Sequence, residues 1–239
     1  MAIITTGDAE EHFDPAEFDA FLLSHGTPAV WRKARTCPCL DPTSGQANIN
    51  CPFCRDYPGL VWDAGVPITI LAPGRARRDQ YDQLGMWMQG MVTLTFPSTV
   101  TPGHQDQVEF LAAELVVNNE RHTRGDPDPL GRSTERLRFP TPLNIEFCEA
   151  IVGADPDGRG GTLIQYGFFG DFTVSDAGTI DWVAGHGPAV GLTYTMRYTA
   201  RPVYVCWSPM SRDEHATKQP YRVLAQRLDF FRQPVVGED

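Results

Sequence analysis

The feature that most constrains this chain is a set of four cysteines close together near the N-terminus. They form two close pairs, Cys37-Pro38-Cys39 and Cys51-Pro52-Phe53-Cys54, separated by a short, turn-rich loop. Each tight turn supplies two thiolates, and the loop returns the second pair to complete a tetrahedral shell of four sulfurs around Zn²⁺. No histidine or carboxylate interrupts the set at ligand spacing, which favours a closed structural site over an open catalytic one. The predicted zinc ligands are Cys37, Cys39, Cys51 and Cys54.

Two disulfides, or four ordinary buried thiols, are the alternative interpretation of these cysteines. Neighbours as close as Cys37 and Cys39 rarely pair with each other, so disulfides would have to cross between the two turns. The first residues are too short for a signal-peptide core, and no apolar run is long enough to span a bilayer. We therefore expect a cytoplasmic origin, where thiols stay reduced and zinc binding is favoured. Cys148 and Cys206 lie in strand-like runs and are expected to be inert core residues.

A short amphipathic helix is predicted just before the cysteines. Asp14 is placed to cap it, Pro15 suits the first helical position, Glu17 completes a capping box, and Gly26 ends the helix. The apolar side chains that repeat at helical spacing are Phe18, Phe21 and Leu22. Helix and cysteine turns together predict a small N-terminal lobe, residues 1–65. Because so small a lobe cannot fill a hydrophobic core unaided, the metal is expected to supply much of its stability.

The second predicted segment, residues 66–239, shows the alternation of apolar and polar residues that is typical of β-strands. The clearest run is 190–199, with its even-numbered residues on one buried face. The run 143–148 predicts a strand with its odd-numbered residues on one face, and 175–178 predicts a hairpin turn. The 22 glycines and 20 prolines favour turns over long helices. We therefore expect a mainly β fold, an antiparallel β-barrel or sandwich, with a small N-terminal helix plus a zinc-binding lobe.

Charge and motifs argue against several classes of function. The net charge of −10 argues against nucleic acid as the main partner, because neutralising phosphates requires clustered Lys and Arg. The sequence contains no nucleophile elbow, no His-Glu-x-x-His, no phosphate-binding loop and no dinucleotide fingerprint. We therefore expect that the chain is not an enzyme. A hydrolase whose carboxylates come together only in the fold is the open alternative.

Charged loops offer candidate assembly contacts. An arginine-rich loop covers residues 75–78, and a long polar excursion covers 122–133. Long loops in a compact β domain are often explained by contact with neighbouring subunits. The candidate contact residues are Arg75, Arg77, Arg78, Arg124, Asp126, Asp128 and Arg132.

Three stretches of the sequence resemble one known family. The first is the cysteine module followed by Gly59-Leu60-Val61-Trp62; the second is 81–96 followed by Asp106-Gln107-Val108; the third is Pro202–Val205 with Leu224–Phe230. In these stretches the chain resembles the neck, or head-to-tail connector, proteins of long-tailed bacteriophages, especially contractile-tailed ones.

The resemblance implies a small β-barrel that forms a ring in the virion neck between portal and tail, as a connector, stopper or gateway. Such a ring helps to close or gate the DNA channel and to attach the tail. The implied partners are further copies of the chain, portal, adaptor and tail proteins, and DNA that passes without sequence recognition; no membrane is involved. The acidic balance suits a channel lining, because basic contacts would create affinity for DNA that has to slide. The expected location is the virion, after synthesis in the host cytoplasm.

Two further interpretations remain open. A tail or baseplate subunit belongs to the same structural class. A zinc-containing binding or regulatory protein, with Cys37 to Cys54 as its recognition module, belongs to a different one.

Overall fold

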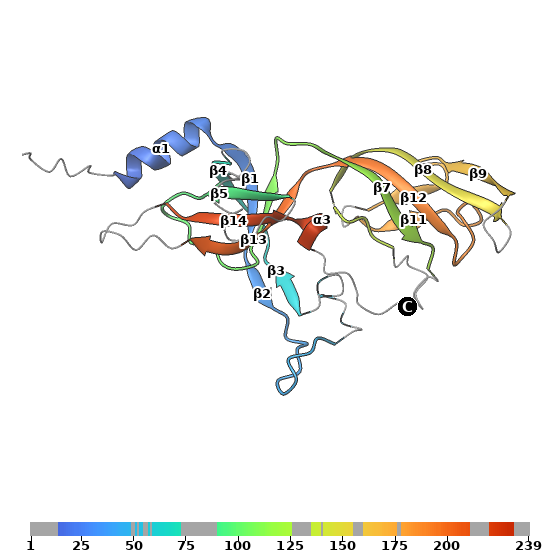
Figure 1. Cartoon of the computed structure of the whole chain (residues 1–239), viewed down its shortest axis with the longest axis horizontal. Helices are drawn as coiled ribbons and strands as arrows, with labels where there is room; N and C mark the ends of the chain where they lie inside the picture. The colour runs from blue at the N-terminus through green and yellow to red at the C-terminus, as the bar shows by residue number, and fades with distance from the viewer. Residues whose placement is uncertain are drawn as a thin grey trace, which may run out of the picture.

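The structure, a computed structural model, describes residues 14–48, 51, 53–54, 57, 59–72, 90–125, 135–139, 141–154, 160–175, 178–210 and 220–231. This part of the chain is mainly β with two short helices, as predicted (Figure 1). The elements are α1 (Pro15–His25), β1 (Thr27–Arg32), β2 (Ala34–Thr36), β3 (Leu60–Trp62), β4 (Val66–Ile70), β5 (Met91–Thr95), β6 (Gln107–Phe110), β7 (Leu115–Thr123), β8 (Pro142–Ala154), β9 (Gly160–Tyr166), β10 (Phe172–Val174), β11 (Ile180–Trp182), β12 (Thr193–Ala200), β13 (Val203–Met210), β14 (Arg222–Arg227) and α3 (Leu228–Phe231).

The larger sheet has six antiparallel strands in the order β4-β1-β6-β13-β14-β5 and curls into a half-barrel. Its two outer strands meet at one end, where Leu71 and Thr95 exchange backbone hydrogen bonds of 3.0 and 2.9 Å. A buried cluster that includes Ile70, Leu94 and Phe96 packs between these strands. The predicted barrel or sandwich is therefore present as a half-barrel, joined to a second, smaller sheet.

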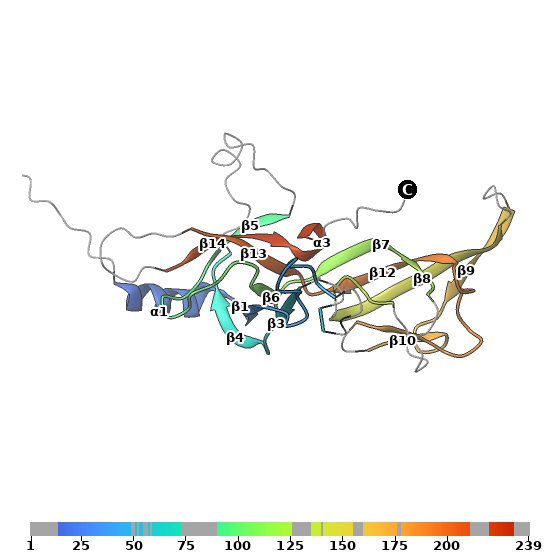
Figure 2. The same cartoon turned by 90° about the horizontal axis from the view of Figure 1, so that it is seen from below.

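The second sheet has four antiparallel strands in the order β7-β12-β8-β9, and the β10–β11 hairpin packs with it (Figure 2). Its central strand β12 alternates strictly, with Tyr194, Met196, Tyr198 and Ala200 buried. This confirms the predicted period-two strand from Thr193 on, whereas its predicted first residue, Val190, is exposed and lies in the preceding turn. The same core cluster also contains side chains of β13 and α3, so it extends from the smaller sheet to the larger one.

Strand β8 departs from the predicted alternation. Its pairing with β12 shifts register between Ile145 and Phe147, so that Glu146 is an extra residue on β8. Such a bulge reverses which face the following side chains occupy. Ile145 packs against the core before the bulge, whereas Cys148 is buried after it and Phe147 shares a face with outward-pointing Arg197. The prediction that Ile145 and Phe147 lie on one face is wrong for this reason.

The predicted segments 1–65 and 66–239 both contribute to the half-barrel. Strand β1 pairs with β4 on one side and with β6 on the other. The boundary predicted at residue 65 thus separates β1 from β4 in the sequence, although these two strands are hydrogen-bonded neighbours in the sheet. Among the described strands of 1–65, β2 and β3 pair with each other and form a separate two-stranded sheet next to the cysteines.

The bounds of helix α1 are as predicted, but its Asp14 cap bonds Ala16 and does not form the capping box predicted with Glu17. The side chain of Asp14 accepts a hydrogen bond from the Ala16 N–H at 2.8 Å, and the Gly26 N–H donates to the Leu22 carbonyl at 2.8 Å. Leu22 is its one buried residue, and Phe21 is exposed, so most of the helix surface faces away from the sheet (Figure 1). Within the described residues, no helix is long and apolar enough to cross a membrane.

Candidate metal centre

The two-stranded sheet β2–β3 fixes both ends of the cysteine segment. Cys37 follows β2 directly, and its N–H donates to the Gly59 carbonyl at 2.9 Å, which extends the β2–β3 ladder by one step. Gly59 has φ +83° and therefore adopts a backbone conformation that favours glycine. The chain thus leaves the sheet at the first cysteine turn and returns to it after the second.

Asp41 organises the loop between the two cysteine turns. Its carboxylate accepts hydrogen bonds from the N–H groups of Thr43 and Ser44 at 2.8 and 2.7 Å. These bonds, the Ser44 N–H first, lower the pKa of Asp41 below its usual range. The Asp41 backbone closes the loop, since its N–H donates to Gln46 and its carbonyl accepts from Gly45. Local turn chemistry therefore directs the chain back toward the first pair of cysteines.

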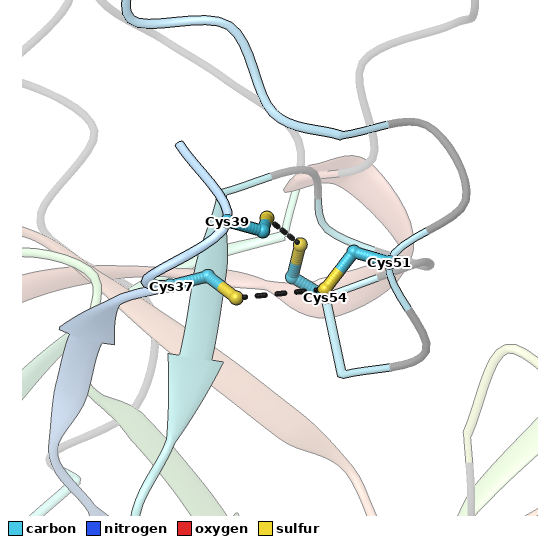
Figure 3. A group of neighbouring side chains, drawn as sticks. All are labelled: Cys37, Cys39, Cys51 and Cys54. Carbon is cyan, nitrogen blue, oxygen red and sulfur yellow. Dashed lines mark hydrogen bonds between the residues drawn. The ribbon is translucent and has the colours of Figure 1, made fainter. Parts of the chain in front are cut away.

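The four cysteine sulfurs meet at one point (Figure 3). All lie within 4.8 Å of one another, with Cys37 3.7 Å from Cys51 and Cys39 3.2 Å from Cys54. A zinc ion with sulfur ligands at about 2.3 Å in tetrahedral geometry separates its sulfurs by about 3.8 Å. A disulfide would need about 2.05 Å, and all four cysteines are free thiols. The arrangement matches a metal-ligand set and could hold a metal ion.

Backbone N–H groups of the second turn favour a thiolate. Those of Phe53 and Cys54 point at the Cys51 sulfur and lower the pKa of that thiol to about 6. By contrast, the hydrogen bond to Cys54 and burial raise the pKa of Cys39 to about 12. Four adjacent thiols cannot all ionise unaided, because thiolates repel one another. A bound cation would remove this conflict, since metal coordination deprotonates thiols.

Among the described residues of 37–62, the fully buried side chains are all cysteines. Cys37, Cys51 and Cys54 form a small buried cluster, and the half-buried side chains packed against it are Cys39, Ala47 and Val61. So few apolar groups cannot offset the entropy of ordering the segment. Metal ligation would provide the missing stability. Among the residues that the structure describes, this is the one group of three or more His, Cys, Asp or Glu placed to hold a metal.

Of the predicted assembly contacts, the structure describes Arg124 alone. Its guanidinium lies over the Trp182 ring at 5.0 Å, and the side chain fills the space beside Gly187. The Arg124 backbone also exchanges hydrogen bonds with the turn before β12, at Gly191 and Leu192. Those predicted contacts that lie outside the described residues are Arg75, Arg77, Arg78, Asp126, Asp128 and Arg132.

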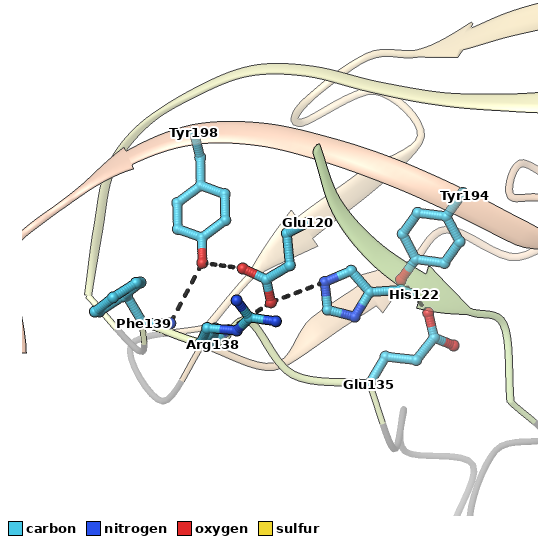
Figure 4. A network of polar contacts seen from close by, with 7 residues as sticks. All are labelled: Glu120, His122, Glu135, Arg138, Phe139, Tyr194 and Tyr198. Atoms are coloured by element: carbon cyan, nitrogen blue, oxygen red, sulfur yellow. Dashed lines mark hydrogen bonds and ion pairs between the residues drawn. The ribbon is translucent and has the colours of Figure 1, made fainter. Parts of the chain in front are cut away.

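A buried polar network in the smaller sheet was not predicted (Figure 4). Glu120 of β7 accepts hydrogen bonds from the Tyr198 hydroxyl and from the Arg138 backbone N–H, the latter at 2.7 Å, and the His122 Nε2 lies 3.2 Å from its carboxylate. The Tyr198 hydroxyl in turn accepts from the Phe139 N–H at 3.3 Å. Glu120 thereby fastens residues 135–139 to the sheet.

Glu135 makes the second half of this network. Its carboxylate accepts from the Tyr194 hydroxyl, from the Trp182 indole at 3.2 Å and from the Gly125 N–H at 3.1 Å. The sequence did carry one signal, because Tyr194 and Tyr198 fall on the buried face of the predicted strand and a buried tyrosine hydroxyl requires a partner. The identity of the partners depends on pairing between distant segments.

No protein-family model and no curated protein sequence matches this chain.

Proposed function

We propose that this chain is a structural subunit of a homo-oligomeric ring, with one structural Zn²⁺ bound by its four N-terminal cysteines. We further propose that the ring lies in the neck of a tailed bacteriophage virion, between portal and tail. There it would help to close or gate the DNA channel and to attach the tail.

The observation that carries the assembly proposal is the arm formed by β8 and β9. Pairing between β12 and β8 ends at Tyr194 and Ala150, and beyond this point β8 and β9 continue as a two-stranded ribbon (Figure 1). Ile151 and Leu163 lie directly opposite each other on the ribbon and are 53% and 59% exposed. A two-stranded hairpin alone is marginally stable in water. Contact with a neighbouring subunit would bury this apolar pair and support the ribbon.

Zinc is the metal that suits this site best. Four cysteine thiolates in tetrahedral array favour Zn²⁺ over hard cations such as Mg²⁺ or Ca²⁺, which prefer oxygen. Because all four positions around the ion would be occupied by sulfur, the role is structural.

The neck location is supported by the resemblance of the cysteine module and its flanking strands to phage connector proteins. The net charge of −10 also suits a channel through which DNA passes without binding. In this proposal the partners are further copies of the chain, portal or adaptor proteins and tail proteins.

One observation favours a second candidate, a zinc-containing binding module. Phe53 lies inside the second cysteine turn, and its side chain is 82% exposed. An aromatic side chain presented by a rigid turn can anchor a protein partner.

Native mass spectrometry under conditions that retain metal tests both parts of the proposal. We expect one zinc per chain and ring-sized oligomers, either from the chain alone or after a portal protein is added. A zinc-bearing monomer that does not assemble with neck proteins would favour the binding module. A chain without metal would refute the zinc centre.

A further inference from the structure

Two aromatic residues of the metal lobe, here residues 37–62, contact the rest of the molecule: Tyr57 and Trp62. Their rings pack edge to face, with centroids 4.8 Å apart. Tyr57 packs against the core cluster that the smaller sheet shares with β13 and α3. Trp62 donates its indole N–H to the Gln105 carbonyl, just before β6 of the half-barrel, at 2.9 Å. This aromatic pair therefore connects the cysteine lobe to both sheets.

The second cysteine turn determines where Tyr57 lies. The Tyr57 N–H donates to the Cys54 carbonyl at 3.2 Å, and the Tyr57 carbonyl accepts from the Leu60 N–H at 2.9 Å. Tyr57 is thus held between a metal-ligand candidate and β3. Because the buried cluster of the lobe consists of cysteines, loss of metal would release this turn and Tyr57 with it.

The partner of Trp62 belongs to the junction between the sheets. Gln105 has φ +67°, and its N–H donates to the Cys206 carbonyl of β13 at 2.6 Å. The next residue, Asp106, is 2% exposed and accepts hydrogen bonds from the Trp31 indole and the Ala34 N–H at 2.9 and 2.8 Å. The lobe is therefore fixed to the point where β1, β6 and β13 come together.

Glu109 marks the same junction from the other side. It is 3% exposed and binds Arg32 of β1 at 2.7 Å. It also accepts from the Thr141 hydroxyl, just before β8, at 3.0 Å. The half-barrel and the smaller sheet meet at β6 and at the β12–β13 connection, beside the residues that the metal lobe contacts.

We propose that the metal-bound lobe is a clasp for this junction, and that metal occupancy sets how tightly the two sheets are joined. With metal bound, Tyr57 covers the shared core and Trp62 holds the turn before β6. Without metal, both contacts are lost while each sheet keeps its own pairing. This inference rests on metal binding by the four cysteines and does not depend on ring assembly.

Hydrogen–deuterium exchange of the full chain, with metal bound and after its removal by a chelator, tests the clasp. We expect faster exchange in 37–62 and also, severalfold, in the paired amides of β6 and of Val203–Val205. The β10–β11 hairpin should exchange as before. Faster exchange confined to 37–62 would overturn the clasp.

A substitution separates the clasp from metal loss itself. Tyr57→Ala should keep one metal per chain and still speed exchange in β6 and Val203–Val205. Phe53→Ala is the matched control, because it removes an aromatic ring from the same lobe where that ring is exposed. If both metal-loaded variants exchange alike at the junction, the clasp is refuted. A parent chain that binds no metal would refute the metal centre instead, and metal content is measured in the same samples.

Discussion

Among single residues, the cysteines fall into two chemically different sets. Burial raises the pKa of Cys148 to about 12 and raises that of Cys206 as well, so both sulfurs stay neutral thiols in the core. Cys51 has its pKa lowered to about 6 by backbone N–H groups and lies beside three other sulfurs. Only a set of the second kind offers a metal several thiolates at once.

This difference predicts the result of single cysteine substitutions. Cys54→Ser should lose the metal and loosen the lobe, with a cost of several kcal/mol to its folding, because structural zinc contributes folding free energy directly. Metal content by mass spectrometry and thermal unfolding of the lobe measure the effect. Cys148→Ala is the control, since it also removes a buried thiol yet should keep the full metal content. An unchanged metal content in Cys54→Ser would contradict the proposed ligand set.

The tyrosines of β12 give a second prediction. Tyr198→Phe removes the hydroxyl that donates to buried Glu120, and leaving a buried acceptor without its donor costs about 1–3 kcal/mol. Chemical denaturation measures this loss. Tyr166→Phe is the control, because its ring packs on Trp182 and no described residue bonds to its hydroxyl; we expect a change below about 0.5 kcal/mol. Equal effects from both substitutions would argue that the network contributes nothing to stability.

The metal-site cysteines and the buried tyrosine–glutamate network differ in how far the sequence could predict them. The cysteines lie close together in the chain, so their spacing alone indicated a shared site. Tyr198 and Glu120 come from paired strands far apart in the sequence. A buried tyrosine was predictable, but its partner was not, because the partner depends on which strands pair and in which register.

Elements that obey local rules were predicted well, whereas irregular ones were not. The caps of α1 and the hairpin turn between β10 and β11 depend on neighbouring residues, and both are present. The bulge at Glu146 has no local signature, since it depends on how β8 pairs with the distant strand β12. The exposed arm of β8 and β9 follows from the same pairing, because it begins where the pairing of β8 with β12 stops.

The arm supplies the prediction at this scale. The double variant Ile151→Thr/Leu163→Thr removes the exposed apolar pair. Threonine at both positions is still compatible with a β-strand. The monomer should unfold within about 0.5 kcal/mol of the parent, because neither side chain is in the core. Native mass spectrometry should show strongly weakened ring assembly. Val190→Thr alters a similarly exposed apolar residue, in the turn before β12, and should assemble normally. Intact rings from the double variant would exclude the arm as the interface.

At the scale of the whole molecule, a mainly β composition was predictable and the sheet order was not. The order β4-β1-β6-β13-β14-β5 brings together strands from both ends of the chain. Alternation within a strand says which residues are buried, but not which strand lies alongside. For the same reason, the boundary expected at residue 65 followed a change of pattern along the sequence, while the half-barrel takes strands from both sides of that position.

The pH dependence of stability should report on Glu120 of β7, which bonds Tyr198 of β12 and so links strands that are distant in the sequence. Burial alone would raise the pKa of Glu120, but the bonds from His122 and Tyr198 outweigh it and lower the pKa below the ordinary value of 4.5. The ionised carboxylate therefore stabilises the folded chain fully above 4.5, and this contribution is lost as the pH falls through the lower, folded value. In Glu120→Gln the side chain does not ionise, so the contribution is absent at every pH.

The difference in unfolding free energy between parent and Glu120→Gln is the quantity to measure, between about pH 6 and about pH 3. We expect the parent to lose more stability than the variant as the pH falls. The unfolding free energy of the parent minus that of the variant should therefore decrease. Acid also releases metal from the cysteines, but it does so in both proteins, and contributions from separate sites cancel in the comparison. A difference that stays constant across this range would mean that Glu120 is not held ionised by its buried partners.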